Sequence, residues 1–460
     1  MQALTLSIAL LGSGLIVFLR PVVGLCVYCA TLFCYPQNLT VKIGTLDFSA
    51  SRIVIVILLA NTILRTRLVR LFKWNWLDTF VFLTFLGQSI ALLSNVSLPR
   101  IMERQGGAFF DTVLPYLAAR LLIRSKSDLF VFVRGLVLIG LVLAFSGAYQ
   151  CVTGHNPVGF LKAYDAWEDI DTRPPEFFLR HGLYRADVTF GNYIGFGMFF
   201  AALAPMCLGL LAERTSRRLA VHTSFALMLV GVVSSMSSGP LLGVFVAISM
   251  VAAYPLRRFW IGILAFIVIC CVFLEFYSNR HFYVVPTRLA FSEQTAYYRI
   301  GLYEEALGGG MRGHWLFGYG YVGIGPGNDN TNFHWEHRDF TSIYIGRLAT
   351  SGLLGLIPLL ALQFAYYRRL YNAFHLTHKR GERWLIWCFS SALVGWNVGL
   401  LTVSLVVQTL GLFYLLAAAA TNMPLICSPA RLENLRVSEP AVRAAIVARQ
   451  RSRITGLSNV

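Results

Sequence analysis

The stretch NFHWEHRDFTSIYIG brings a high density of reactive groups into a chain that is only 13% charged. It contains His334, Glu336, His337, Arg338 and Asp339. Imidazole and carboxylate groups exchange protons, so the stretch could supply a general base. The alternative is a metal site, because the two histidines are one helical turn apart. A catalytic zinc site needs a third ligand, and the stretch has no HExxH pattern, so the sequence favours acid–base chemistry without a metal.

Two arginines elsewhere indicate a second kind of chemistry. Arg185 lies in HGLYRADVTFGNYIG, and Arg299 lies in QTAYYRIGLYEEALGGG. A guanidinium group can donate two parallel hydrogen bonds to phosphate oxygens, which predicts the binding of a lipid phosphate or diphosphate. The alternative is a structural ion pair with Asp187 or Glu304.

Membrane helices are expected to position these groups. The 460-residue chain is 56% hydrophobic with a mean hydropathy of +0.62. A membrane-spanning helix needs roughly 20 mainly apolar residues. We therefore predict an all-α polytopic integral membrane protein with about 12 to 13 transmembrane helices. The expected helical stretches are 1–19, 21–35, 50–64, 77–95, 109–123, 128–152, 186–212, 219–236, 239–255, 258–277, 341–367, 384–401 and 403–420.

Basic residues explain both the net charge of +17 and the orientation of the chain. They gather at every second short connection, as expected for cytoplasmic loops, so no nucleic acid partner is needed. Long polar connections usually carry function, and here they face outward. We predict that residues 1–277 form membrane helices and include an outward loop at 153–185. Residues 278–340 form a large outward loop, residues 341–427 the last membrane helices, and residues 428–460 a basic cytoplasmic tail.

A glycine run in the large loop resembles a nucleotide-binding motif. GYGYVGIGPG places Gly318, Gly320 and Gly323 in G-x-G-x-x-G spacing. A dinucleotide site requires a strand before this spacing and a helix after it, whereas here it lies between membrane helices. We interpret the run as a turn-rich loop and expect no cofactor.

Several stretches in order resemble the O-antigen ligase superfamily, which includes lipopolysaccharide O-antigen ligases and polysaccharide repeat-unit polymerases. They are LYRADVTFGNYIGFGM, SSMSSGPLLGVFVAI, YYRIGLYEEAL with HWLFGYGYVGIGPGN, and HRDFTSIYIGRLATSGLLGL. The first segment, FLRPVVGLCVYCATLFCYPQNL, also resembles the amino terminus of such ligases. The resemblance implies a multi-pass glycosyltransferase of the bacterial inner membrane, with its active site facing the periplasm, its C-terminus in the cytoplasm and no metal requirement.

The same resemblance implies roles for individual residues. Arg185 matches the family's arginine before the central helix, and Arg299 with Tyr303 matches its R-x-x-x-W/Y motif. The family's histidine position, counted back from Gly352, falls on Thr341, and His337 lies one helical turn upstream. His334, Glu336 and Asp339 are the alternatives as the base, and together with Tyr303, Arg338 and Arg347 they are the candidates for substrate contacts.

The expected reaction transfers glycan from an undecaprenyl-diphosphate-linked donor to an acceptor hydroxyl. The diphosphate is already a leaving group, so the enzyme must remove the acceptor's proton and stabilise the departing charge. The acceptor is either a lipid A core sugar in a ligase or the growing polysaccharide in a polymerase, and the residues leave both open. A transporter or flippase of such precursors is the alternative from another class, for which Asp111 and Arg134 are the main intramembrane candidates. Both lie near the ends of the expected helices.

Overall fold

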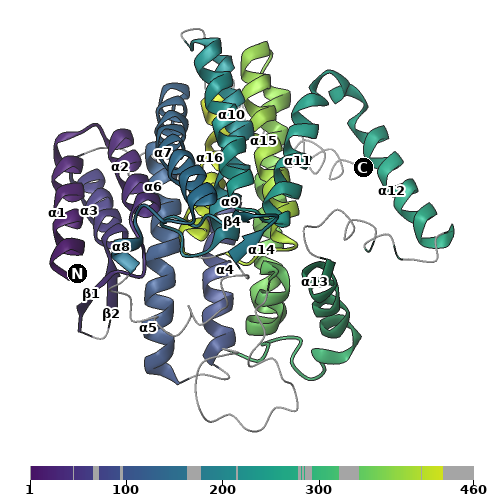
Figure 1. Cartoon of the computed structure of the whole chain (residues 1–460), viewed down its shortest axis with the longest axis horizontal. Helices are drawn as coiled ribbons and strands as arrows, with labels where there is room; N and C mark the ends of the chain where they lie inside the picture. Colours follow the sequence, from purple (N-terminus) through teal and green to yellow (C-terminus); the bar gives the residue numbers. More distant parts are fainter. Residues whose placement is uncertain are drawn as a thin grey trace, which may run out of the picture.

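The computed structural model of the chain describes residues 2–44, 46–65, 72–93, 97–162, 178–213, 216–277, 281, 284, 293–320, 341–405 and 407–427. These residues are mainly helical, with two short antiparallel hairpins (Figure 1). The expectation of an all-α protein with apolar helices is confirmed for the part of the chain that is described.

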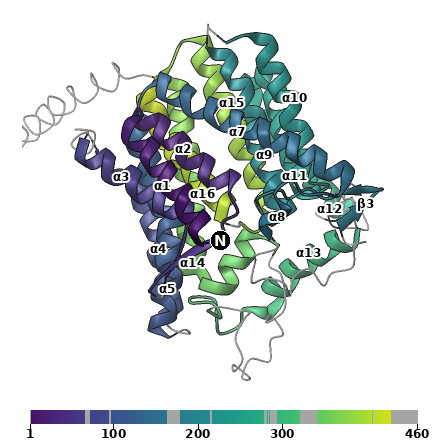
Figure 2. The same ribbon diagram turned by 60° about the vertical axis from the view of Figure 1, so that its left-hand side comes forward.

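Three amino-terminal helices form one side of the molecule in both views (Figures 1 and 2). They are α1 Gln2–Phe18, α2 Pro21–Cys34 and α3 Ala50–Arg65. α1 and α2 are separate because Pro21 opens α2 and the residue before it, Arg20, is extended, as the ring of a following proline favours. A hairpin of β1 Thr40–Ile43 and β2 Leu46–Ser49 joins α2 to α3.

One continuous helical path follows α4 Trp76–Leu93. It consists of α5 Leu98–Ala108, the π-helical turn η2 Phe109–Val113 and α6 Leu114–Leu122, and the backbone stays right-handed helical at both junctions. The sequence predicted only the second half of this helix. α5 was missed because its sequence, LPRIMERQGGA, is polar and ends in glycines, which are weak helix formers.

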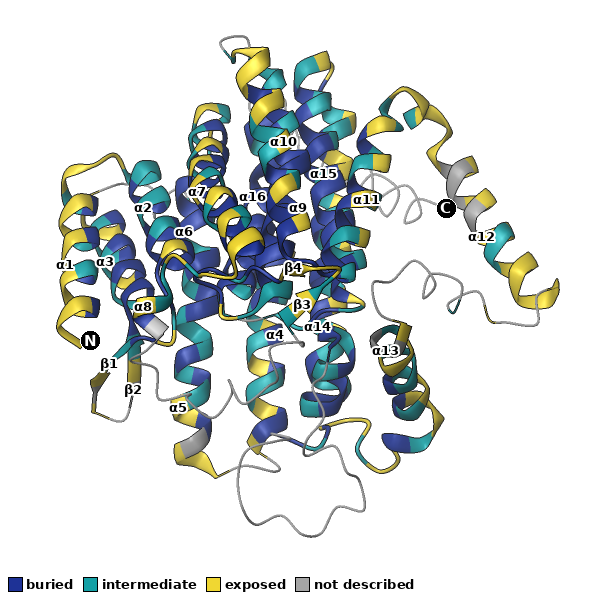
Figure 3. Ribbon diagram, viewed as in Figure 1, coloured by how far each residue is buried: buried dark blue, intermediate teal, exposed yellow. Residues whose placement is uncertain are grey.

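Two helices form the centre of the bundle. α9 Tyr193–Gly209, continued by η5 Leu210–Ala212, and α16 Val407–Cys427 are buried along most of their length (Figure 3). Their sequences are apolar on every face, which is typical of a helix surrounded by other helices or lipid. The helices α7 Lys126–Thr153, α10 Arg218–Ser234, α11 Ser238–Ala252 and α15 Arg380–Leu400 pack around α9.

The longest helix, α14 Ile343–Leu376, packs against α4 and α16. Its contact with α4 is close enough that a Cβ atom on Gly87 would overlap the carbonyl group of Leu354. Small residues commonly permit such backbone contact between membrane helices. α14 also extends beyond the predicted end at residue 367, so Arg368 and Arg369 lie on the helix and not in the following connection.

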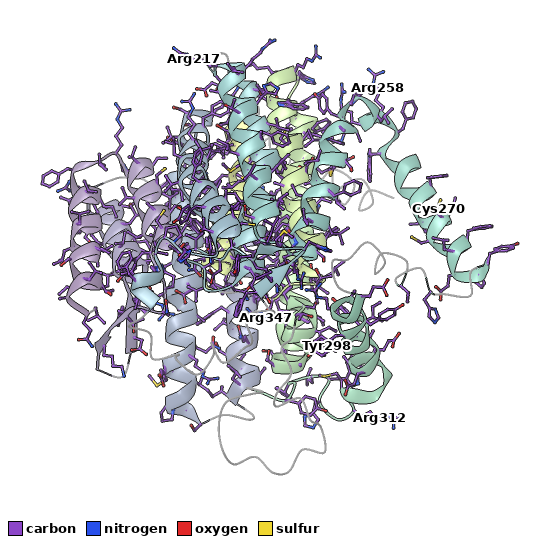
Figure 4. The ribbon with its side chains drawn as sticks, viewed as in Figure 1. Arg217, Arg258, Cys270, Tyr298, Arg312 and Arg347 are labelled. Atoms are coloured by element: carbon purple, nitrogen blue, oxygen red, sulfur yellow. The ribbon has the colours of Figure 1, made fainter. Side chains whose placement is uncertain are left out.

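The helix α12 Trp260–Tyr277, preceded by η6 Tyr254–Phe259, stands away from the other helices (Figure 1). Its apolar side chains are largely exposed, for example 82% for Phe276, as expected for a surface in contact with lipid. Figure 4 places Arg217 and Arg258, from two of the basic connections, at the opposite end of the molecule from Tyr298 and Arg312.

Among the described residues, five helices are long and apolar enough to cross a membrane. They are Trp76–Leu93, Lys126–Thr153, Tyr193–Ala212, Ile343–Leu376 and Val407–Cys427. Further apolar helices are shorter, and they are Gln2–Phe18, Pro21–Cys34, Arg218–Ser234, Ser238–Ala252 and Val268–Tyr277.

Candidate functional site

A short hairpin places two arginines on one face. After the short helix α8 Gly159–Lys162, strands β3 Leu179–Arg180 and β4 Leu183–Tyr184 pair with Arg180 opposite Leu183. The connecting residues, His181 and Gly182, have φ values of 53° and 80°, as a tight two-residue hairpin turn requires. The amide of Arg185 extends the pairing by donating to the carbonyl oxygen of Phe178 at 2.9 Å. Because side chains alternate between faces, Arg180 and Arg185 emerge on the same side.

Arg185 is held against the first residue of the central helix α9. Its side chain is buried, and its Cζ atom lies 3.0 Å from the centroid of the Tyr193 ring. The side chain of Asn192 caps α9 by accepting from the amides of Ile194 and Gly195 at 2.8 and 3.3 Å. The guanidinium group is therefore fixed beside a helix N-terminus, where backbone dipoles add positive potential.

Arg299 lies on the helix α13 Glu293–Glu305, which η8 Ala306–Gly310 continues, and its charge acts on Arg185. α13 docks on the beginning of α14 through a small apolar cluster formed by Leu302, Ala306, Ile345 and Ala349. Tyr303, one turn after Arg299, bonds through its hydroxyl to Ser342 Oγ at 2.7 Å and donates to the carbonyl oxygen of Leu401 at 2.9 Å. Residues four apart share a helix face, so Tyr303 fixes the face that carries Arg299.

Arg180, Arg185 and Arg299 form what we call the arginine cluster. Burial lowers the pKa of Arg185 to about 9, with smaller lowering effects from the positive charges of Arg180 and Arg299, while Tyr193 acts in the opposite direction. Burial also lowers the pKa of Arg180, whose Nη1 donates to the carbonyl oxygen of Met236 at 3.1 Å. Like charges held together out of water favour a bound anion, which would compensate both effects.

The ion-pair alternative does not account for Arg185. Within the described ranges no carboxylate forms an ion pair with it, and its Nε atom is buried without a hydrogen-bond partner. Asp187 instead accepts from Gln150 Nε2 at 2.8 Å and from Asn156 Nδ2 at 3.2 Å. Asp187 therefore fixes the loop that carries Arg185.

This loop contains a strained residue. Val188 has a φ of 45°, which is rare for a β-branched side chain. Its conformation is held by the amide of Val188 donating to Gln150 Oε1 at 3.0 Å and by Gln408 Nε2 donating to the carbonyl oxygen of Thr189 at 3.1 Å. Backbone strain maintained in this way is common in binding sites.

A loop bonds to α14 where the helix is broken. At Gly352 the backbone leaves helical geometry, with φ 58° and ψ −156°. The amide of Leu353 donates to the carbonyl oxygen of Trp315 at 2.7 Å, and the amide of Tyr319 donates to the carbonyl oxygen of Ala349 at 2.7 Å. Positive φ values at Gly318 and Gly320, 70° and 78°, allow the loop to turn there. This agrees with a turn-rich loop, while Gly323 lies outside the described residues.

Five of the predicted site residues cannot be located in the described part of the chain. His334, Glu336, His337, Arg338 and Asp339 lie outside the described residues. Thr341, on which the family's histidine position falls, is buried, and its Oγ1 atom has no hydrogen-bond partner among the described residues.

Arg347 is not joined to the arginine cluster by any contact in the described parts of the chain. It donates from Nη1 to Gln88 Oε1 of α4 (Figure 4 shows its position on α14). Arg347 therefore belongs to the contact between α14 and α4.

Neither a protein-family profile nor a curated protein matches this chain.

Arg180 and Tyr193 were missed by the sequence reasoning. The sequence RHGLYR contains the signal for Arg180, because a His-Gly pair between two short apolar segments is compatible with a tight hairpin turn. Tyr193 follows an asparagine at a helix start, which is a capping signal, but no pattern in the sequence indicates that an arginine stacks on its ring.

Proposed function

We propose that the chain is a membrane glycosyltransferase that moves glycan from an undecaprenyl-diphosphate-linked donor to an acceptor hydroxyl at the periplasmic face of the bacterial inner membrane. The observation that carries the proposal is the arginine cluster. Arg185 lies beside the N-terminus of α9, and the charges of Arg180 and Arg299, from two separate segments, act on it. Such a site suits a diphosphate, whose several oxygens can accept from more than one arginine.

The proposed topology has about 12 to 13 membrane spans, with residues 278–340 forming the large periplasmic loop and the C-terminus in the cytoplasm. It is supported by the separation between the basic residues Arg217 and Arg258 and the segments around Tyr298 and Arg312 (Figure 4). The shorter apolar helices fit this topology if the bilayer thins locally around them.

In the proposed mechanism Arg185 and Arg299 hold the diphosphate and stabilise its charge as the bond to the sugar breaks. Arg180 adds a third positive charge to the same site. His337 or a neighbouring carboxylate takes the proton from the acceptor hydroxyl, and direct displacement inverts the anomeric carbon. The proton leaves the acceptor oxygen, that oxygen bonds to the anomeric carbon, and the diphosphate departs with the electron pair of the old bond. A lipid A core acceptor or a growing polysaccharide chain fits this mechanism equally.

A transporter or flippase of lipid-linked precursors is the second candidate. One observation favours it: Asp111, expected near a helix end, lies within the continuous α5–η2–α6 helix and pairs with Arg52. Arg134, the other candidate, pairs with Glu213.

Glycan transfer by the purified chain in lipid vesicles tests the proposal. The donor is an undecaprenyl-diphosphate-linked oligosaccharide, and the variants are Arg185→Ala, Arg299→Ala and His337→Ala. Arg312→Ala is the matched control, because Arg312 is an exposed arginine in the turn after η8 and is not part of the cluster. Loss of transfer in Arg185→Ala and Arg299→Ala, with the control active, supports the role of these arginines in holding the diphosphate. Full activity of Arg299→Ala would refute it, and movement of donor across the bilayer without transfer would favour the transporter.

A further inference from the structure

A cavity with both polar and apolar lining is formed by residues that do not belong to the arginine cluster. Its volume is about 360 Å³, and it lies between β2, the start of α3, the end of α4 and the α5–η2 helix. None of the described residues that line it comes from α13 or from the β3–β4 hairpin. Its size is at the lower end for small-molecule sites and fits one or two sugar rings.

The π-helical turn η2 builds one wall of this cavity. A π turn adds a residue to the helix, and such turns are frequent at functional sites. Asp111 within it accepts from Arg52 Nε at 3.0 Å and from Arg52 Nη2 at 2.6 Å. A Cβ atom on Gly107 would lie 3.0 Å from Arg52 Nη2, so the glycine leaves room for the guanidinium group. Arg52 Nη1 also donates to the carbonyl oxygen of Asp47 at 2.6 Å, which holds the hairpin to the helix.

The charges in the cavity do not favour an anion. Among the described residues, Asp47, Glu103 and Asp111 line it together with Arg52 and Arg104, so carboxylates outnumber guanidinium groups by one in this part of the lining. Arg52 is already neutralised by its paired contact with Asp111. A diphosphate would therefore be repelled here, in contrast to the arginine cluster.

The same lining suits a neutral ligand rich in hydroxyl groups. Each hydroxyl donates one hydrogen bond and accepts others, and the cavity offers carboxylate acceptors, guanidinium donors and the amides of Gln88 and Gln105, which do both. Phe48 and Phe110 add an apolar surface, with their rings edge to face at 5.4 Å between centroids. A sugar ring combines polar edges with apolar C–H faces and would contact both kinds of surface.

The first segment of α14 connects the cavity to the arginine cluster. Ile345 and Ala349 pack against α13, which carries Arg299. Arg347 lies two residues from each, about 200° around the helix, and bonds to Gln88 in the cavity wall. α13, which carries Arg299, and Gln88 of α4 therefore contact opposite faces of one short helical segment.

We infer that this cavity binds a neutral sugar ring, and, resting on the proposed function, that this ring belongs to the acceptor. The donor's own sugar is the other source of the same chemistry. That sugar is bonded directly to the diphosphate and must lie beside the arginine cluster, so the cavity formed by other residues is assigned to the acceptor.

Saturation-transfer NMR on the full chain in detergent tests the binding. The probes are the methyl glycosides of glucose, galactose, mannose and rhamnose. Ala108→Trp fills the cavity without removing any of its charges, because Ala108 lines it. Met102→Trp is the matched control, since Met102 is on the same helix and 67% exposed. We expect a signal for at least one glycoside in the parent and the control, and a signal at least roughly tenfold weaker in Ala108→Trp. Equal signals in Ala108→Trp, or no binding by the parent, would overturn the inference.

Kinetics and pyrophosphate binding separate this inference from the proposed function. In Ala108→Trp the KM for the acceptor should rise roughly tenfold while pyrophosphate binding stays unchanged. A raised donor KM instead would overturn the assignment to the acceptor. Sugar binding that depends on Ala108, in a chain that neither binds pyrophosphate nor transfers glycan, would support the cavity and refute the proposed function. Pyrophosphate binding without sugar binding would refute the cavity alone.

Discussion

Replacing Arg185 with methionine should stabilise the free protein while weakening diphosphate binding. Methionine retains much of the length of the arginine side chain but removes its charge. Burial is the main cause that lowers the pKa of Arg185 from 12.5 to about 9, and this corresponds to roughly 5 kcal/mol of destabilisation of the cation. The side chain is only 5% exposed, so little solvent screening reduces this cost.

The gain is offset in part by the lost contact with Tyr193, where Cζ lies 3.0 Å from the ring centroid. A desolvated cation–π contact contributes about 2 kcal/mol. The free energy of unfolding of Arg185→Met should therefore rise by about 1 to 4 kcal/mol, the range found when apolar residues replace buried charges. Loss of one charge-assisted bond to phosphate should weaken pyrophosphate binding by roughly 10- to 100-fold.

The assay is thermal unfolding in detergent, with and without pyrophosphate. The parent should be stabilised by pyrophosphate, by about 2.7 kcal/mol at a concentration 100 times the Kd. Arg185→Met should melt at a higher temperature than the parent without the anion and respond weakly to it. Arg312→Met, at an exposed position, should behave like the parent. A lower melting temperature for Arg185→Met combined with an undiminished response to pyrophosphate would refute the reasoning about the cluster.

Three further changes test the supports of the two sites. Gly318→Ala should destabilise the protein by about 2 kcal/mol or more, because its φ is 70° and the new Cβ would lie 2.6 Å from the carbonyl oxygen of Ala349. Thermal unfolding measures the loss, and Gly308→Ala is the control, because a Cβ atom there meets open space. Tyr303→Phe removes the hydroxyl that anchors α13 to α14, so transfer should fall several-fold with about 1 kcal/mol of stability lost, and an unchanged kcat would contradict the positioning role. Asp111→Asn leaves the half-buried Arg52 without its counter-charge and should cost about 3 kcal/mol. Arg52→Met should restore much of this stability in the double variant. A double variant that melts no higher than Asp111→Asn would show that the charges do not compensate each other.

The helices were predictable because apolar length is a local property of the sequence. Each predicted stretch contains a helix, and the stop between α1 and α2 follows from Arg20 and Pro21. The polar helix α5 was not predictable in this way, since its helical state depends on continuing into η2 and α6. For the same reason Asp111 was expected near a helix end, although it lies inside a continuous helix.

The site was predictable only in part. Arg185 and Arg299 stand out because guanidinium groups on an outward face have no topological explanation. Their convergence depends on how the β3–β4 hairpin and α13 are packed, which no local pattern specifies. The strands of that hairpin have two residues each, too short for an alternating pattern, so Arg180 was missed.

The break at Gly352 separates two helical registers within α14. In an unbroken helix, one inserted residue rotates all residues beyond it by about 100°. An insertion before Ala349 would then turn either Ile345 away from α13 or Leu354 away from α4. Where the backbone leaves helical geometry such a rotation can be absorbed, because the amide of Leu353 bonds to the neighbouring loop and not to the preceding turn. Changes of length in the segment before Gly352 can therefore accumulate without altering how the segment after it packs, so the two parts can diverge independently.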